Sequence, residues 1–338
     1  MAAERPTIAM IAREVGVSVP TVSKVLNGRT DVAPATRARV EEVLARHQYR
    51  KPTARSLTRS GRLIELVIHE ADTIWAMELI KGVERVAGPA RIGVVLSELG
   101  GSHRPRQEWI DDVMARRPLG VVFVLSELDG RQREQLASRG IPYVVVDTQG
   151  EIPRGVHTVG SNNWNGGLIA TRHLIALGHR RIGVVAGPRD ILCSRARVDG
   201  YRSAHDEAGI QLDPAIARWG NFRSEAGYEH GGALLDLPER PTAIFAGSDL
   251  QALGVVRAAQ ERGLRIPEDL SLVGYDNLPI TEWLNPPLTT VTQPLQEMAG
   301  LATRLVLELA QGETPSSTHV ELGTELVVRG STGPVPAA

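Results

Sequence analysis

The sequence predicts an α/β protein in two parts, a small N-terminal domain of three helices and a large body built on parallel sheets. Two patterns support this fold class. Apolar residues recur at helical spacing through residues 7–47, and from residue 62 onward short runs rich in Val and Ile alternate with helical stretches. The 338 residues suffice for two or three domains, and the 42% apolar fraction is ordinary for a globular protein.

The first two helices are expected within residues 7–27, which read TIAMIAREVGVSVPTVSKVLN. Gly16 favours the backbone that ends a helix, Ser18 stands where an N-cap oxygen is needed, and Pro20 suits a first turn. The apolar faces are predicted to consist of Ile8, Ile11, Ala12, Val15, Val22, Val25 and Leu26. Two short helices joined by a tight turn form a helix-turn-helix, whose second helix can enter the DNA major groove.

A third helix is expected over residues 34–47, with Pro34 in its first turn.

The charge of the chain is unevenly distributed. Residues 1–62 contain 12 Lys and Arg against 5 Asp and Glu, a net charge of +7, whereas the whole chain has a net charge of -1. A basic head on an acidic body is expected where only the head meets phosphate; the alternative is an ordinary solvated basic face.

The segment that follows, residues 50–62, is rich in Arg and has no acidic residue. Such a segment repels itself when free and is expected to order against a polyanion. Leu57 is its one large apolar residue. It is either an exposed side chain without a role or a wedge between base pairs in the minor groove.

The body shows the alternation that is typical of parallel sheets covered on both faces. Helices are expected around 75–87 and 105–116, and strands within 63–70, 90–99, 119–126, 141–147, 180–187, 242–249 and 270–276. Ligands of such sheets bind at the carboxyl ends of the strands. Those ends carry the polar residues His69, Glu70, Ser126, Asp147, Ser248, Asp249, Asp276 and Asn277.

Several function classes lack any support in the sequence. There is no phosphate-binding loop, no G-x-S-x-G motif and no cluster at metal-ligand spacing, so we expect no catalytic residue, no metal and no cofactor. Cys193 is the only cysteine, which suits a reducing compartment. No run of about 18 apolar residues and no signal-peptide core occur, so a cytoplasmic protein without a membrane span is expected.

With these residues in hand, the chain resembles the LacI/GalR family of transcription regulators from about Thr7 to Arg329. The head matches through TIAMIAREVGVSVPTVSKVLNG, and the body has blocks similar to those of the family at 158–187, 194–201, 243–255, 266–277 and 286–294. The blocks occur together and in order, which makes the resemblance specific.

The resemblance implies a body like that of periplasmic sugar-binding proteins, with two α/β subdomains across a cleft. We expect a helix-turn-helix domain at 1–50, a hinge at 51–61 and an effector-binding and dimerisation body at 62–338. The N-subdomain would comprise about 62–160 and 291–320, and the C-subdomain about 161–290 and 321–332. The resemblance also implies a homodimer that reads a near-palindromic double-stranded operator, one head for each half-site.

The resemblance assigns DNA contacts to the head and the segment after it. Base contacts would fall on Val19, Pro20 and Lys24, and phosphate contacts on Thr7, Ser18, Thr21, Ser23 and Asn27. Val19 and Pro20 lack side-chain donors, so they either touch a thymine methyl or only shape the start of the helix, while Lys24 can donate to guanine. Ala54, Arg55 and Leu57 resemble the family's hinge helix, although the linker after Tyr49 is one residue short and lacks the usual Asn.

Effector contacts carry over to residues spread along the body. They are Trp75, Ser126, Asp147, Trp164, Arg197, Phe222, Ser248, Asp276 and Trp283. Arg197 matches the family arginine that reaches the ligand, and Asp276 matches the acid that accepts hydroxyl hydrogen bonds. An Arg–Asp pair with flat aromatic side chains suits a neutral polyol better than a phosphate.

The sequence therefore predicts a DNA-binding transcription regulator, a repressor, that is controlled by a small-molecule effector, expected to be a sugar. Two alternatives are a sugar-binding module without a DNA role and an α/β enzyme that uses a nucleotide. The basic helix-turn-helix argues against the first, and the missing phosphate loops argue against the second.

Overall fold

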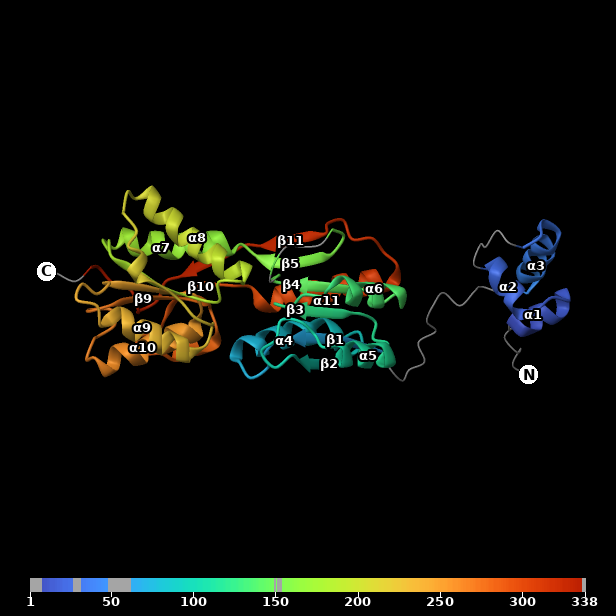
Figure 1. Cartoon of the computed structure of the whole chain (residues 1–338), viewed down its shortest axis with the longest axis horizontal. Helices are drawn as coiled ribbons and strands as arrows, with labels where there is room; N and C mark the ends of the chain where they lie inside the picture. The colour runs from blue at the N-terminus through green and yellow to red at the C-terminus, as the bar shows by residue number, and fades with distance from the viewer. Residues whose placement is uncertain (1–7, 27–31, 48–61, 149, 151–153, 336–338) are drawn as a thin grey trace. The chain divides into compact units, whose positions relative to one another are not determined.

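The computed structural model of the chain describes residues 8–26, 32–47, 62–148, 150 and 154–335 (Figure 1). It divides into two compact units, Met1–Gly61 and Arg62–Ala338. The first unit contains helices only and the second contains two mainly parallel sheets, so the predicted fold class is confirmed. Among the described residues, no helix combines the length and apolar character that a bilayer span requires.

The head is a bundle of three helices, α1 (Ile8–Val15), α2 (Val19–Leu26) and α3 (Pro34–Arg46). Gly16 follows α1 with a φ of 74°, the left-handed conformation that glycine adopts without steric cost. The buried core consists of Ile11, Ala12, Val15, Val22, Val25, Val32, Val40, Val43 and Leu44, while Ile8 is partly buried against it. For these residues the helical faces predicted from spacing are confirmed.

The body contains two six-stranded sheets, and the helices around each sheet define a subdomain. The sheet of the N-subdomain has the strand order β11–β5–β4–β3–β1–β2, and that of the C-subdomain has the order β12–β10–β9–β8–β6–β7. Every neighbouring pair is parallel except β10 and β12. The strands are β1 (Leu63–Ile68), β2 (Gly93–Glu98), β3 (Val121–Val124), β4 (Tyr143–Val146), β5 (His157–Ser161), β6 (Ile182–Ala186), β7 (Ala217–Trp219), β8 (Ala243–Ala246), β9 (Ser271–Asp276), β10 (Thr289–Thr292), β11 (His319–Leu322) and β12 (Glu325–Val327).

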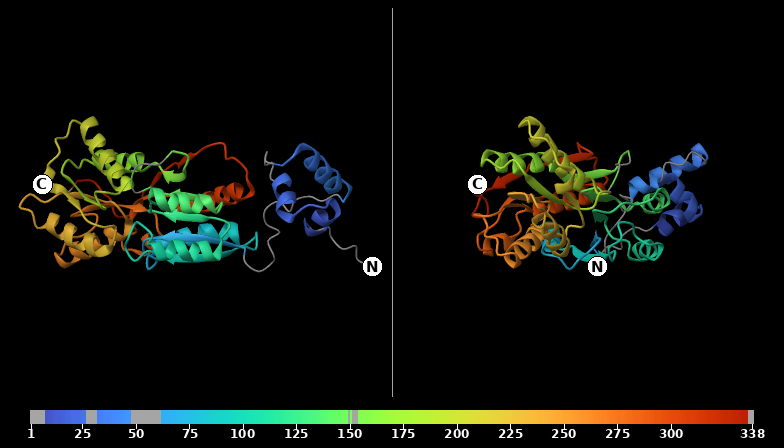
Figure 2. Two further views of the ribbon diagram at one scale, coloured as in Figure 1. Left: turned by 45° about the vertical axis from the view of Figure 1, so that its right-hand side comes forward. Right: turned by 60° about the vertical axis from the view of Figure 1, so that its left-hand side comes forward.

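Helices cover both faces of each sheet, as two further views also show (Figure 2). In the N-subdomain, α4 (Ile74–Ala87) and α11 (Leu295–Gln311) cover one face, and α5 (Gln107–Arg116) and α6 (Gly130–Ser138) cover the other. In the C-subdomain, α7 (Asn163–Ala176) and α8 (Leu192–Glu207) lie opposite α9 (Ser224–Leu235) and α10 (Asp249–Glu261). Two short 3-10 helices, Pro214–Ile216 and Pro279–Trp283, complete the elements described.

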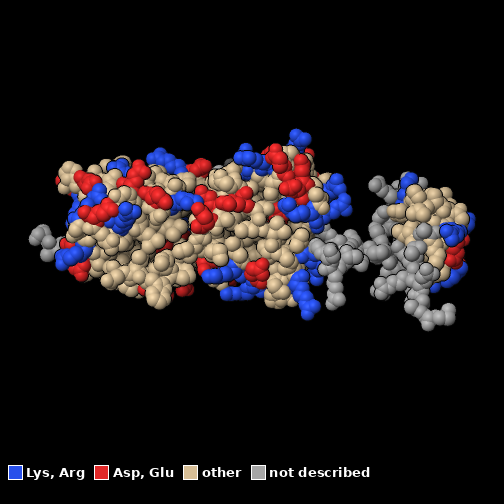
Figure 3. All heavy atoms as spheres, turned by 90° about the horizontal axis from the view of Figure 1, so that it is seen from below, with Lys and Arg blue, Asp and Glu red and all other residues tan. Residues whose placement is uncertain are grey.

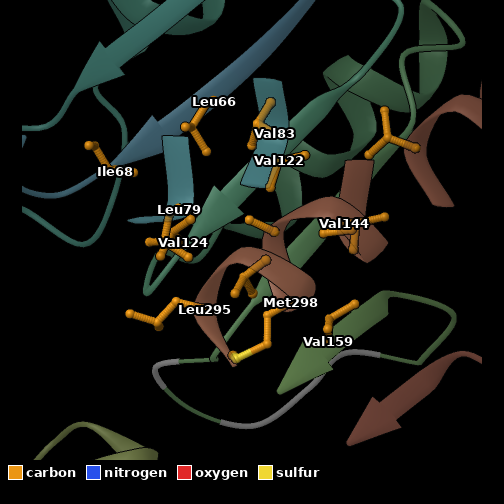
Figure 4. Close-up of a cluster of buried hydrophobic side chains, with 14 of the residues drawn as sticks. Leu66, Ile68, Leu79, Val83, Val122, Val124, Val144, Val159, Leu295 and Met298 are labelled. Carbon is orange, nitrogen blue, oxygen red and sulfur yellow. The ribbon is translucent and has the colours of Figure 1, made fainter. Parts of the chain in front are cut away.

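The core of the N-subdomain explains why consecutive apolar residues dominate β1, β3 and β4. Leu66 and Ile68 point into the cluster drawn in Figure 4 with Leu79 of α4 and Met298 of α11, whereas Val67 between them packs on the opposite face of the sheet. A strand that is buried on both faces needs apolar residues at consecutive positions.

The chain crosses between the two sheets three times, between β5 and α7, between β10 and α11, and between β11 and β12. Elements on both sides of each crossing are fixed in separate sheets, so any movement of the subdomains relative to each other must bend the chain at the crossings.

On the face of the body shown in Figure 3, basic and acidic side chains are interspersed rather than gathered into an area of one sign.

Candidate functional site

The first candidate site is the exposed side of α2 in the head. The helix begins where the sequence predicts, because the Ser18 hydroxyl accepts a hydrogen bond from the Thr21 N–H at 3.3 Å. The Ser18 and Thr21 hydroxyl oxygens also lie 2.8 Å apart. Pro20 lies in the first turn, where its missing N–H leaves no helical bond unmade.

One side of α2 is in the core and the other is open. Val22 and Val25 are buried, whereas Val19 is 45% exposed and Pro20 and Lys24 are exposed. The three residues predicted to read bases therefore lie on the open side of a single helix. Thr21 and Ser23 are half-buried on the same helix. Thr7, Asn27, Ala54, Arg55 and Leu57 lie outside the described residues.

The second candidate site is a cavity of about 260 Å³ in the body. Both subdomains contribute to its wall, which forms at the carboxyl ends of strands, the position that the parallel-sheet pattern predicts. Six of the nine residues proposed for effector binding line it, namely Trp75, Asp147, Arg197, Phe222, Ser248 and Asp276.

Arg197 of α8 is the most extensively bonded side chain of the cavity. Its guanidinium donates to the Asn163 side chain at 2.8 Å, to the Gly247 carbonyl at 2.5 Å and to the Gln293 side chain at 3.1 Å. The group also lies over the Tyr275 ring, 3.6 Å from its centroid. These contacts fix a buried positive charge in one orientation, because most of its N–H groups are bonded within the protein.

Asp147 and Asp276 are two buried carboxylic acids that face this charge from different subdomains. Burial raises the pKa of Asp147 to about 6 although Arg197 and a hydrogen bond from Gln293 act against it. Burial raises the pKa of Asp276 to about 7. Arg197 Nη1 lies 3.7 Å from Asp276 Oδ1, within ion-pair range but too far for a hydrogen bond, and that oxygen has no hydrogen-bond partner among the described residues.

The backbone at these strand ends is unusual. Leu125 and Asp147 follow β3 and β4 with φ values of 48° and 47°, and Asp276 ends β9 with a φ of 111°. Non-glycine residues rarely adopt positive φ, and such conformations concentrate at functional sites. All three residues line the cavity.

Two aromatic side chains give the cavity its apolar walls. Trp75 lies in the first turn of α4 in the N-subdomain, and Phe222 lies in the loop before α9 in the C-subdomain. The Ser248 hydroxyl donates to the Phe222 carbonyl at 2.8 Å and caps α10 by accepting the Gln251 N–H. Ser248 therefore holds the Phe222 loop in place as well as lining the cavity.

An ion-pair cluster connects the subdomains beside the cavity. Arg223, which precedes α9, donates to Glu70 Oε2 at 2.9 Å and to Asp72 Oδ1 at 2.8 Å. Both acids belong to the loop between β1 and α4, so the contact joins the C-subdomain to the N-subdomain. Glu70 and Arg223 also line the cavity.

Three residues proposed for effector binding lie outside the cavity wall. Ser126 is buried, donates to the Val124 carbonyl at 2.8 Å and lines a separate pocket of the N-subdomain. Trp164 is 44% exposed and Trp283 is 85% exposed. Ser126 does not line the cavity because Leu125, one position earlier, takes the turn that does.

Further residues of the cavity were not among those proposed. His69 and Glu70 end the first strand run, so the strand-end rule pointed to them, whereas His103, Asn221 and Arg223 come from loops that have no distinguishing pattern. Asp249, also at a strand end, is bonded to Thr290 and to the Leu278 N–H inside the C-subdomain. Within the described ranges, no group of three or more His, Cys, Asp or Glu side chains is arranged to hold a metal.

Comparisons with known proteins agree with this two-part arrangement. A sequence model described as "Bacterial regulatory proteins, lacI family" matches residues 7–51, and one described as "Periplasmic binding protein-like domain" matches residues 171–332. The "HTH-type transcriptional repressor CytR" of Escherichia coli (strain K12) is 33% identical over 334 residues, 98% of this chain and 97% of CytR.

Solved structures match over the same extent. A "transcriptional regulator CelR-cellobiose complex" is 32% identical with a TM-score of 0.72 and covers 97% of this chain and 100% of its own. A lac repressor dimer bound to operator and the anti-inducer ONPF is 26% identical with a TM-score of 0.70, covering 98% and 100%. The head and the body are thus matched together by DNA-binding transcriptional regulators.

Proposed function

The chain belongs to the LacI family of DNA-binding transcriptional regulators, and from this membership we propose a repressor whose operator affinity is set by a neutral sugar in the cavity of the body. It would act in the cytoplasm as a homodimer on a near-palindromic operator, without a catalytic step. The observation that most directly supports a sugar as the ligand is the pair of buried carboxylic acids, Asp147 and Asp276. They line the same cavity as the Arg197 guanidinium and two aromatic side chains.

The chemistry of the cavity supports a polyol over an anion. Carboxylate oxygens accept hydrogen bonds from hydroxyl groups, and Trp75 and Phe222 offer flat faces to the C–H surface of a sugar ring. Arg197 directs three of its five N–H groups to protein acceptors, which leaves two for a sugar hydroxyl and makes it a poor phosphate clamp. The cellobiose in the CelR complex supports the same ligand class here.

In the head, the exposed face of α2 supports base contacts by Val19, Pro20 and Lys24. Phosphate contacts are proposed for Thr7, Ser18, Thr21, Ser23 and Asn27, and minor-groove contacts for Ala54, Arg55 and Leu57 in a hinge at 51–61. A sugar that binds one arrangement of the two subdomains more tightly would shift the dimer toward that arrangement. In one arrangement the two heads would have the spacing of the operator half-sites, and in the other they would not.

The test combines selection of bound genomic fragments, gel shift with the selected operator and calorimetry with a panel of sugars. We expect specific DNA binding whose affinity changes when one sugar is added. Arg197→Ala should weaken binding of that sugar at least 30-fold, because loss of one partner from a buried charged site costs about 2 kcal/mol or more. Its operator affinity without sugar should be unchanged.

Arg172→Ala is the matched control, because Arg172 pairs with Glu207 on the surface of the C-subdomain. It should alter neither sugar nor DNA binding. Unchanged sugar affinity in a folded Arg197→Ala protein would place the effector elsewhere, and a chain that binds sugar but no DNA would refute the regulatory role.

A further inference from the structure

Two histidines stack in the N-subdomain wall of the cavity and have no part in the function proposed above. His69 follows β1, and His103 lies in the loop between β2 and α5. Their ring centroids are 5.0 Å apart with an interplanar angle of 25°, and both residues line the cavity. Neither the resemblance nor the strand-end pattern singles out His103.

The hydrogen bonds of His103 determine which of its nitrogens holds a hydrogen. Nδ1 lies 2.6 Å from the carbonyl oxygen of Leu125, which can only accept, so Nδ1 must be the donor. In the neutral ring Nε2 is then an acceptor with a lone pair. No protein donor to Nε2 is found among the residues that the structure describes, and His103 is half-buried in the cavity wall rather than sealed in the core.

The surroundings hold this acceptor in a fixed orientation. Leu125 presents its carbonyl from a left-handed turn with a φ of 48°, and the His69 ring supports the other side of the imidazole. The backbone is also tied down, because the Glu127 N–H donates to the His103 carbonyl at 2.9 Å and the Gly101 N–H donates to the His69 carbonyl at 2.8 Å. An acceptor that is fixed before binding loses little freedom on binding.

The rest of the cavity has the same bias toward accepting hydrogen bonds. Arg197 donates to three protein groups, and Arg223 donates to Glu70 and Asp72. Ser248 donates to the Phe222 carbonyl. The strongest donors are thus largely engaged within the protein, whereas Asp276 Oδ1 has no hydrogen-bond partner among the described residues and only the ion-pair contact with Arg197 at 3.7 Å. A ligand that brings donors of its own complements such a cavity.

We propose that His103 is a specificity-determining residue of the effector site, where its Nε2 accepts a hydrogen bond from a hydroxyl or ammonium group of the ligand. This inference rests on the proposed function, since it assigns a residue to the same cavity. It adds that the effector is read from the N-subdomain by the His103 imidazole as well as from the C-subdomain, and that ligands presenting only anionic acceptors at this position are rejected.

The test uses the full chain and calorimetry. Glucose, ribose and cellobiose are the neutral probes, glucosamine supplies an ammonium donor, and gluconate and glucose 6-phosphate are the anionic probes. We expect a neutral sugar or glucosamine to bind, and which of the two binds more tightly identifies the donor. Binding of the anionic probes alone would overturn the role of His103 and the choice of a neutral sugar but leave a regulator that responds to a sugar derivative, whereas no binding by any probe would overturn the proposed effector class and this inference with it.

Substitutions then assign the contact. With the probe that binds, His103→Phe should weaken affinity about 10-fold, as for one lost hydrogen bond in a buried site. His103→Gln should lose less, because an amide can both donate to the Leu125 carbonyl and accept from the ligand. His157→Phe is the control, since His157 begins β5 outside the cavity and should change nothing.

Monodeoxy analogues of the bound sugar complete a double-mutant cycle. One analogue should bind the parent about 10-fold more weakly than the intact sugar, yet show no further loss with His103→Phe, because the two changes remove the same interaction. If every analogue shows the same loss in the parent and the variant, His103 makes no such contact. If thermal denaturation shows that His103→Phe does not fold, His103→Met replaces it in the same cycle.

Discussion

Asp276 is a buried carboxylic acid whose Oδ1 lies 3.7 Å from a guanidinium nitrogen and has no hydrogen-bond partner among the described residues. Burial raises its pKa to about 7, so in the native state it gives up its proton less readily than in the unfolded chain, where the pKa is near 3.8. Because ionising Asp276 costs more in the native state than in the unfolded chain, its contribution to the free energy of unfolding is fully present below pH 4. That contribution is lost as the pH rises through 7.

We therefore expect the free energy of unfolding of the sugar-free protein to fall between about pH 4 and 7, and Asp276→Asn to reduce this fall. One unit of pKa shift corresponds to about 1.4 kcal/mol. Asp147, with a pKa of about 6, contributes in the same direction and remains in the variant. Chemical denaturation across pH 4 to 8 is the measurement, and equal pH dependence in parent and variant would contradict the unpartnered state of Asp276.

Individual cavity residues could be predicted where they follow a strand. The rule that ligands meet carboxyl ends of parallel strands led to Asp147, Ser248 and Asp276, all of which line the cavity. It could not separate Leu125 from Ser126, because the turn that decides between them is set by a positive φ rather than by residue type. His103 and Arg223 are in loops, whose course depends on contacts distant in the sequence.

At the scale of elements, α2, the helix proposed to contact bases, offers few side chains that could read them. Lys24 is the one long cationic residue on its exposed face. Lys24→Ala should weaken specific operator binding by about 1–3 kcal/mol and relax preference at one base pair, because Lys donates to guanine in the major groove. Lys24→Arg should retain most of the affinity. Binding to a library of single-base operator variants is the readout, and a uniform loss over all variants would make Lys24 a phosphate contact instead.

The contact between Arg223, at the start of α9, and the loop between β1 and α4 connects the two subdomains beside the cavity. The side chains of Arg223, Glu70 and Asp72 are 33%, 27% and 65% exposed, so each pair is worth no more than about 1 kcal/mol. Arg223→Gln should accordingly raise the rate of sugar dissociation only several-fold, as measured by stopped-flow fluorescence of the tryptophans. The effect should shrink in the parent at high salt, and an unchanged rate would mean that sugar leaves without separating this contact.

The elements themselves differ in how far they could be predicted. Seven apolar runs predicted strands that the structure contains. Six of these strands are buried on both faces and need consecutive apolar residues, whereas β2 is a largely exposed edge strand. The strands β5, β7, β10, β11 and β12 were missed. They are short, three are at the margins of the sheets, and sequences such as TTVT or HVEL contain no apolar run. β11 pairs with β5 from more than 150 residues away, which no local pattern can reveal.

At the scale of the whole molecule, regulation requires that the cavity and the crossings between subdomains move together. Gln293 lies in the crossing between β10 and α11. Its amide donates to Asp147 of the N-subdomain at 2.8 Å and its oxygen accepts from Arg197 of the C-subdomain at 3.1 Å. One side chain thus bonds to both walls of the cavity from a segment that must deform when the subdomains shift.

We expect Gln293→Ala to reduce the coupling between sugar and operator. Without the amide, each subdomain keeps its own fold, but the arrangement of the two walls depends less on whether the cavity is occupied. The ratio of operator affinities with and without saturating sugar, measured by fluorescence anisotropy, should fall by about 5-fold or more, roughly 1 kcal/mol of coupling free energy. Gln311→Ala, at the exposed end of α11, should leave the ratio unchanged.

Thermodynamic linkage provides an internal check on this prediction. The operator must change the affinity for sugar by the same factor by which sugar changes the affinity for operator, in the parent and in the variant alike. If Gln293→Ala weakens sugar binding but leaves both ratios intact, the residue only contacts the ligand site. If both ratios fall together while the sugar still binds, the crossing that holds Gln293 transmits the effector's preference from the cavity to the arrangement of the subdomains.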